Sequence, residues 1–196
     1  MRTFVILAHD APLTPNFPLD DLPGAAGRLD VLCRCVTSGL LQSHGIRTDT
    51  KIIVILQDEL ILSFSGDELR NLHPDERSTA ARFRDALEDA RNAVGAMAVE
   101  SSPGVTIRRG GVADVLETAP TLIAQLHPDG DPIQSLGVPD PSTFILSDHH
   151  PFSQEDIHRI QPFVTNRCSL GPVAIHADHA ITIAHNYLDT AGYERY

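Results

Sequence analysis

Tryptophan is absent from this sequence of 196 residues, lysine occurs once, and cysteine occurs three times. Cys33, Cys35 and Cys168 are odd in number and lack the CxxC spacing of common zinc sites, so we expect reduced, partly buried thiols. No apolar run approaches the roughly 20 residues that a membrane-spanning helix needs. The apolar start of the chain, residues 1–8, is also too short for a signal peptide. These absences predict a cytoplasmic protein with no membrane attachment.

Several catalytic signatures are missing as well. The sequence has no GxGxxG, no GxxxxGK[ST] and no GxSxG, which argues against a nucleotide triphosphatase and against a serine hydrolase. His176 and His179 could share one helical face, but there is no HExxH pattern and His185 lies more than a turn and a half farther along. We therefore expect no metal site, and a metal-dependent hydrolase is the least favoured alternative.

Charge is strongly one-sided. The formal net charge is −11, and Lys51 is the only basic residue that is not arginine or histidine. Abundant acids with almost no lysine suggest a proteome adapted to high internal salt, as in a halophilic archaeon. At about 1 M salt the Debye length is only about 3 Å, so the net charge loses most of its power to exclude RNA as a partner.

Hydrophobic periodicity predicts an α/β fold. The hydrophobic share of 42% suffices for one domain over residues 1–196. Apolar runs alternate with helical patterns, which indicates a mostly parallel sheet flanked by helices. The expected strands are 3–8, 51–56, 59–64, 105–108, 121–126, 144–146 and 163–169, with a turn at 101–104. The expected helices are 25–43, 67–72, 80–94, 112–117, 154–160 and 177–188.

Small and polar residues follow the ends of three predicted strands. A turn-rich run comes after Leu126, Ser147-Asp148-His149-His150 follows the next strand, and Ser169-Leu170-Gly171-Pro172 precedes the last helix. Open α/β sheets bind ligands at the carboxyl ends of their strands. We therefore expect these segments to hold a small cofactor at one edge of the sheet.

Three motifs carry a family resemblance. The run from Ser169 to Pro172, followed by Ile175-His176-Ala177-Asp178-His179 and 181–189, resembles the C-terminal signature of the archaeal tRNA pseudouridine N1-methyltransferases. Leu146-Ser147-Asp148-His149 resembles the LGDH loop of that family, and 27–34 resembles its GRxDxxxR segment. The family belongs to the SPOUT superfamily of knotted methyltransferases, and the resemblance runs nearly end to end.

The resemblance implies a deep trefoil knot in about 120–196 that grips S-adenosyl-L-methionine, and a homodimer. Ser147 stands where the family usually has glycine, and Ala180 where it often has cysteine. The cofactor-binding residues that it implies are Leu126, Ser147, Ser169, Leu170, Gly171, Pro172, Val173, Ile175 and Ala180.

The implied reaction is methylation of N1 of pseudouridine in the T-loop of tRNA, at position 54. Asp148 is the candidate for orienting the substrate or accepting its proton, and capping of the following turn is an equally good interpretation. Arg28 and Arg34 are candidates for phosphate contacts, although they could be plain surface arginines. The alternatives are methylation of a ribosomal RNA pseudouridine, and a non-catalytic RNA-binding or ligand-sensing protein of the same fold.

Overall fold

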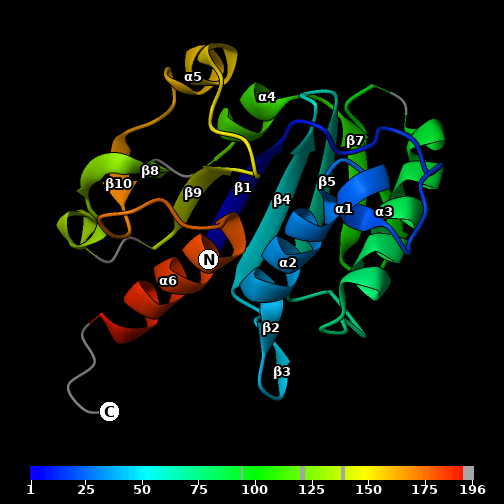
Figure 1. Cartoon of the computed structure of the whole chain (residues 1–196), viewed down its shortest axis with the longest axis horizontal. Helices are drawn as coiled ribbons and strands as arrows, with labels where there is room; N and C mark the ends of the chain where they lie inside the picture. Colours follow the sequence, from blue (N-terminus) through cyan, green and yellow to red (C-terminus); the bar gives the residue numbers. More distant parts are fainter. Residues whose placement is uncertain (94, 120–121, 138–139, 192–196) are drawn as a thin grey trace.

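An eight-stranded sheet runs through the protein (Figure 1). The computed structural model describes residues 1–93, 95–119, 122–137 and 140–191. From one edge to the other, the strand order is β10 (Asn166–Ser169), β8 (Ile123–Pro132), β9 (Ser142–Ser147), β1 (Arg2–Ala8), β4 (Thr50–Leu56), β5 (Leu60–Ser65), β7 (Val105–Arg109) and β6 (Val99–Ser102). A short antiparallel pair, β2 (Leu41–Gln42) and β3 (Gly45–Ile46), stands apart.

The sheet has a parallel half and an antiparallel half. The strands from β10 through β4 pair in parallel, whereas β5, β7 and β6 pair antiparallel. β1 lies in the middle with both faces covered: Phe4 and Ile6 point into one core, Val5 and Leu7 into the other. Side chains alternate between faces along a strand, so a continuous apolar run is what a strand buried on both faces requires.

Helices cover both faces of the sheet. α2 (Leu29–Leu40) lies beside α6 (Ala177–Thr190), and α3 (Glu76–Asp89) packs against α2 over the larger core (Figure 1). The smaller core on the other face takes side chains from α4 (Val112–Leu116) and α5 (Gln154–Ile160). The remaining helical elements are α1 (Leu22–Ala25) and the 3-10 turns η1 (Ala90–Asn92) and η2 (Ile133–Leu136). No helix in the described ranges is long and apolar enough to cross a membrane.

The α/β fold class and most of its elements are confirmed, and α5 has the bounds that the sequence predicts. Besides the predicted helix over 25–43, four element predictions were wrong. Residues 67–72 form the end of a turn and an irregular segment instead of a helix, and β6 occupies part of the expected turn at 101–104. β8 continues past Leu126, with an irregularity in its pairing where Arg167 gives way to Cys168. β10 begins only at Asn166. Val94 and Thr121, expected in a helix and a strand, lie outside the described residues.

The predicted helix over 25–43 is interrupted. Gly27 and Arg28 have positive φ angles of 54° and 59°, so α1 ends before them and α2 starts after them. A Cβ on Gly27 would lie 1.8 Å from the Asp10 carbonyl oxygen. A tertiary contact therefore imposes this break, and local helical periodicity gives no sign of it.

Replacing Gly27 with alanine tests this contact. Gly27→Ala is expected to lower the free energy of unfolding by at least about 1–2 kcal/mol, the cost of left-handed backbone for a residue with a Cβ, because the Asp10 backbone must also move. Thermal denaturation measures the loss. Gly45→Ala is the control, since a Cβ there meets nothing within 4 Å. Equal melting temperatures for the two variants would contradict the interpretation.

Candidate functional site

Three chain segments converge on one cavity of about 390 Å³ at the parallel end of the sheet. They are the start of the run after Leu126, the loop that follows β9, and the segment between β10 and α6, drawn in orange in Figure 1. Of the candidate cofactor-binding and catalytic residues, those lining the cavity are Leu126, Ser147, Asp148, Leu170, Gly171, Val173, Ile175 and Ala180. Ser169 and Pro172 are not among the lining residues. Instead, the Ser169 hydroxyl donates to the Gly171 carbonyl at 2.7 Å and so shapes the turn.

The cavity suits a ligand with a large apolar part and a few polar atoms. Leu126, Leu146 and Leu170 contribute apolar walls. Ser147 Oγ is buried and has no hydrogen-bond partner among the described residues. A Cβ added at Gly171 would meet no protein atom within 4 Å. A buried hydroxyl without a partner is costly, so one supplied by a ligand would stabilise the complex.

Asp148 fastens the loop after β9. One carboxylate oxygen accepts from His9 Nδ1 at 2.8 Å and from the His150 backbone amide at 2.9 Å, and the other accepts from the His9 backbone amide at 2.9 Å. Burial by itself raises the pKa of Asp148, but the hydrogen bonds from His9 and His150 outweigh burial and lower it below its ordinary value. The hydrogen bond from the His150 amide is the turn cap that the sequence left open as one interpretation, and the role of Asp148 toward a substrate stays a prediction.

His9 is a site residue that the sequence analysis missed. It lies at the end of β1, and its second ring nitrogen, Nε2, is 2.9 Å from Oδ2 of Asp156 in α5. The hydrogen bond to Asp148 is the main cause that raises the pKa of His9 to about 9; burial opposes it and Asp156 adds to it. The available signal was a histidine directly after a buried strand, but only the pairing of β1 with β9 brings it to Asp148.

Arg28 precedes the first residue of α2, Arg34 lies in the middle of the helix, and the two share one buried carboxylate. Both guanidinium groups donate to Asp30, and Arg34 also donates to Glu76 at 2.7 Å and lies 3.6 Å from Asp178. Burial raises the pKa of Asp30, but the hydrogen bonds from both arginines outweigh it and lower the pKa. Neither arginine lines the cavity. They are therefore structural partners of Asp30 as well as candidates for contacts with RNA.

The cysteines and the late histidine pair take no part in the cavity. All three thiols are free and buried, and burial raises the pKa of each. The His176 and His179 rings stack edge to face at the start of α6. Asp10, His149 and His150 bring potential ligand atoms within 4.8 Å of one another. However, His150 Nε2 and an Asp10 carboxylate oxygen are 2.7 Å apart and can hydrogen-bond to each other without a metal ion, whereas His149 Nδ1 is buried with no hydrogen-bond partner among the described residues.

The α/β fold has a largely apolar cavity at the edge of its sheet, lined by three loops. This arrangement is typical of α/β proteins that bind a small ligand, and such proteins are the class to which this chain is assigned. The chain belongs to a specific family of that class, because residues 1–193 match the family described as putative SAM-dependent RNA methyltransferases.

Relatives and one solved structure agree with this membership. The chain is 55% identical to a tRNA (pseudouridine(54)-N(1))-methyltransferase of Haloarcula marismortui and 53% identical to that of Haloferax volcanii, with 100% of both chains covered in each case. Its fold resembles Archaeoglobus fulgidus Nep1 bound to S-adenosylhomocysteine, with a TM-score of 0.70 at 12% identity over 97% of this chain and 98% of the other.

Gly171→Val is expected to weaken binding of S-adenosylhomocysteine by roughly ten- to a hundredfold, since overfilling a packed site costs about 1–3 kcal/mol. The melting temperature of the free protein should not change, because the added atoms enter open space. Calorimetric titration measures the affinity. Gly45→Val, also in open space but outside the cavity, is the matched control. Unchanged affinity in Gly171→Val would show that the ligand lies elsewhere.

Ser147→Ala tests whether the buried Ser147 hydroxyl forms a hydrogen bond to the ligand or has no partner even when the ligand is bound. If Ser147 Oγ bonds to the ligand, affinity falls roughly fivefold to tenfold, the equivalent of one hydrogen bond of about 1–1.5 kcal/mol. Ser142→Ala is the control, because Ser142 Oγ is also buried without a partner in the described chain but does not line the cavity. Identical affinities for both variants would rule the contact out.

The expectation that the protein binds no metal is tested with a chelator. Dialysis of the protein against EDTA is expected to leave both the melting temperature and the affinity for S-adenosylhomocysteine unchanged, because Asp10 and His150 can hydrogen-bond to each other and need no metal ion to hold them. A drop in either quantity that zinc or another divalent ion restores would contradict this prediction.

Proposed function

We propose that this protein transfers a methyl group from S-adenosyl-L-methionine to N1 of pseudouridine at position 54, in the T-loop of tRNA. The carrying observation is the cavity at the sheet edge, formed by the segments that the family resemblance assigns to the cofactor. The target nucleotide comes from the names of relatives that match the full chain at 55% and 53% identity.

The residues present fit S-adenosyl-L-methionine. When bound, this cofactor supplies a methyl group on a positively charged sulfur, ready for in-line displacement. Leu126, Ser147, Leu170, Gly171, Val173, Ile175 and Ala180 would line its site, with Ser169 and Pro172 shaping the turn beside it. Ala180 is buried at the wall, where the family often has cysteine, so a thiol is not required for the wall to close.

Positioning carries most of the catalysis in this proposal. The chain has to hold the extruded base against the methyl group and exclude water, and such placement alone lowers a barrier substantially. The N1 proton of pseudouridine must also leave. Asp148 has both oxygens engaged by the protein, so it orients the loop while water or another group receives the proton.

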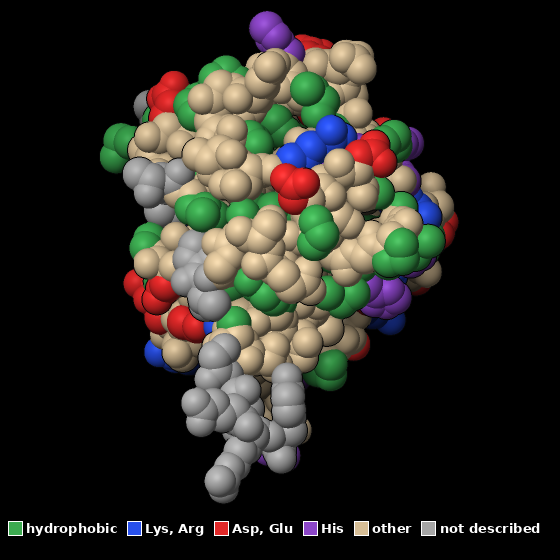
Figure 2. Space-filling model, turned by 90° about the vertical axis from the view of Figure 1, so that its left-hand side faces the viewer, with side chains coloured by type: hydrophobic (Ala, Val, Ile, Leu, Met, Phe, Trp, Pro, Cys, Tyr) green, Lys and Arg blue, Asp and Glu red, His purple; other side chains and the backbone are tan. Residues whose placement is uncertain are grey.

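The finer features of the fold belong to the same proposal. We infer that the C-terminal part, about 120–196, is knotted as in SPOUT methyltransferases, and that the whole chain is one domain. Two copies would form a homodimer that covers the exposed apolar side chains of Val173, Ile175 and Ile183. Hydrophobic side chains are spread over the face at the β10 end of the sheet (Figure 2). Activity in the cytoplasm follows from the tRNA substrate.

Arg28 and Arg34 are the proposed RNA contacts. Their side chains are 40% and 32% exposed, so guanidinium nitrogens can reach phosphate while Asp30 holds the arginines in place. A net charge of −11 gives little attraction to RNA at long range. Binding then depends on shape and on a few charged contacts.

The decisive experiment is methylation in vitro followed by mass spectrometry of tRNA fragments. Purified protein, S-adenosyl-L-methionine and tRNA carrying pseudouridine at position 54 should give a gain of one methyl group at that nucleotide. The same tRNA with uridine at position 54 should not react. Methylation of a ribosomal RNA fragment in place of tRNA would favour the rival substrate, and no methylation of either would favour a non-catalytic RNA-binding protein.

A further inference from the structure

We propose that His9 is a positioning residue whose doubly hydrogen-bonded imidazolium ties both ends of the segment 148–156 together and thereby fixes one wall of the ligand cavity. The proposal rests on the proposed function only in assigning S-adenosylmethionine and its product to that cavity.

The two contacts of the ring require its protonated form. Nδ1 lies 2.8 Å from Oδ1 of Asp148, and Nε2 lies 2.9 Å from Oδ2 of Asp156. A neutral imidazole has one N–H and one lone pair, so one of the two carboxylates would face a lone pair. Only the imidazolium donates to both at once, and each such charge-assisted hydrogen bond is stronger than a neutral one.

The carboxylates of Asp148 and Asp156 are too buried for water to replace the His9 imidazolium as their partner. The side chains of Asp148 and Asp156 are 2% and 11% exposed, so water cannot fully replace His9 as a partner. Asp156 also caps α5, since its Oδ2 accepts from the amide and hydroxyl of Ser153 at 2.8 and 2.7 Å. Loss of the positive charge would leave two largely buried negative charges with only neutral hydrogen-bond donors and no cation, which is unfavourable.

The segment closed by His9 supplies a continuous part of the cavity wall. The run from Asp148 to Phe152 lines the cavity, and Asp148 and Asp156 are the points at which His9 holds it. Its position therefore depends on an interaction with the end of β1, far away in sequence. If the interaction is lost, this wall moves relative to Leu126 and Leu170 on the opposite segments, and the ligand is held less well.

The surroundings of His9 set the pH at which the interaction fails. The other charged groups facing it are Asp58, Glu155 and Arg159, which line a neighbouring polar cavity with His9. The His150 ring also faces it, and the centroids of the two rings are 5.7 Å apart. Hydrogen bonds to Asp148 and then Asp156 raise the pKa of His9 from 6.5 to about 9. Because the folded pKa is raised, the stabilisation is complete below pH 6.5 and is lost as pH rises through about 9.

The test is the affinity for S-adenosylhomocysteine, measured by calorimetry between pH 7 and pH 10 on the full chain. Wild-type affinity should fall as pH rises through about 9. In Asp156→Asn the amide oxygen can still accept from Ser153, but the negative charge facing His9 is gone. The same fall in affinity should therefore occur at lower pH. In His9→Asn, affinity at pH 7 should already be roughly tenfold weaker, the scale of a charge-assisted hydrogen bond, and should not fall further in this range.

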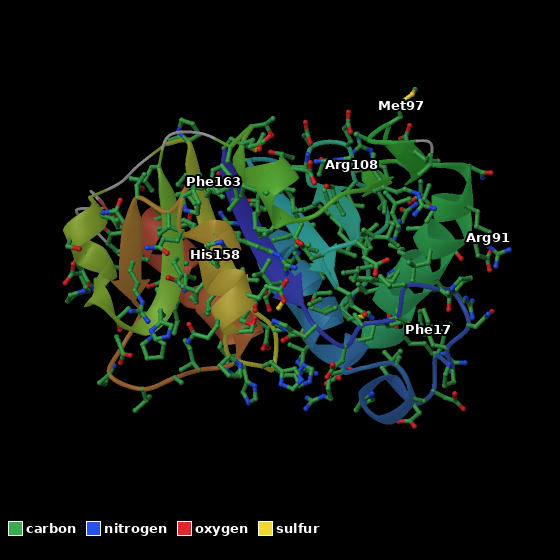
Figure 3. All side chains as sticks on the ribbon, turned by 90° about the horizontal axis from the view of Figure 1, so that it is seen from above. Phe17, Arg91, Met97, Arg108, His158 and Phe163 are labelled. Atoms are coloured by element: carbon green, nitrogen blue, oxygen red, sulfur yellow. The ribbon has the colours of Figure 1, made fainter. Side chains whose placement is uncertain are left out.

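His158→Asn is the matched control. His158 is an exposed histidine on α5, the helix that also carries Asp156, the second partner of His9 (Figure 3). It should reproduce both the affinity and the pH dependence of the wild type. A residue with a merely structural role would change the melting temperature without moving the pH dependence. If His9→Asn does not fold, the test depends on Asp156→Asn, in which the fall in affinity should occur at a lower pH than in the wild type.

Two results would overturn the proposal: an affinity in His9→Asn that keeps the wild-type pH dependence, or an Asp156→Asn profile that coincides with the wild type. Failure of the proposed function looks different. In that case S-adenosylhomocysteine binds with the expected pH dependence, which supports the role of His9, while tRNA carrying pseudouridine at position 54 is not methylated.

Discussion

The parallel pairing of β1 with β9 is the interaction on which the site depends. The register sets Leu7 beside Ser147, and the Asp148 amide donates to the Leu7 carbonyl at 3.0 Å. Both strands therefore leave the sheet at the same place and in the same direction. That shared exit brings His9 to Asp148 and orients the loop that lines the cavity. The register holds because β1 and β9 are apolar on both faces, and a slip of one residue would exchange the side chains of two different cores.

Buried carboxylates have a structural role throughout this acidic chain. Asp30 holds Arg28 at the left-handed entry to α2 and Arg34 farther along the helix, while Asp148 and Asp156 share one histidine. Each pair combines hydrogen bonds with opposite charge, the condition under which a charge can be buried. The same arrangement limits what these acids can do chemically. A carboxylate whose oxygens are already engaged is a poor proton acceptor, which is why the proposed mechanism relies on placement of the substrate.

Local patterns predicted much of the fold. The central strands were found because they are continuous apolar runs, and α5 because residues 154–160 follow a helical pattern. The cavity segments were found because small and polar residues follow strand ends, and the family motifs gave their ligand. The break at Gly27 and Arg28 was missed because it comes from contact with the Asp10 carbonyl. The role of His9 was missed because its two partners lie 139 and 147 residues away.

The sequence by itself determined the alternation of strands and helices, the apolar character of both sheet faces and the loops that can hold a ligand, since each depends on neighbouring residues. Tertiary structure alone decided which strands are neighbours and which carboxylate each cation contacts. It also decided that the helical segment near the N-terminus is broken at Gly27 and Arg28, between α1 and α2. Those outcomes depend on register and on contacts between distant segments, and the local pattern of hydrophobic and polar residues does not encode them.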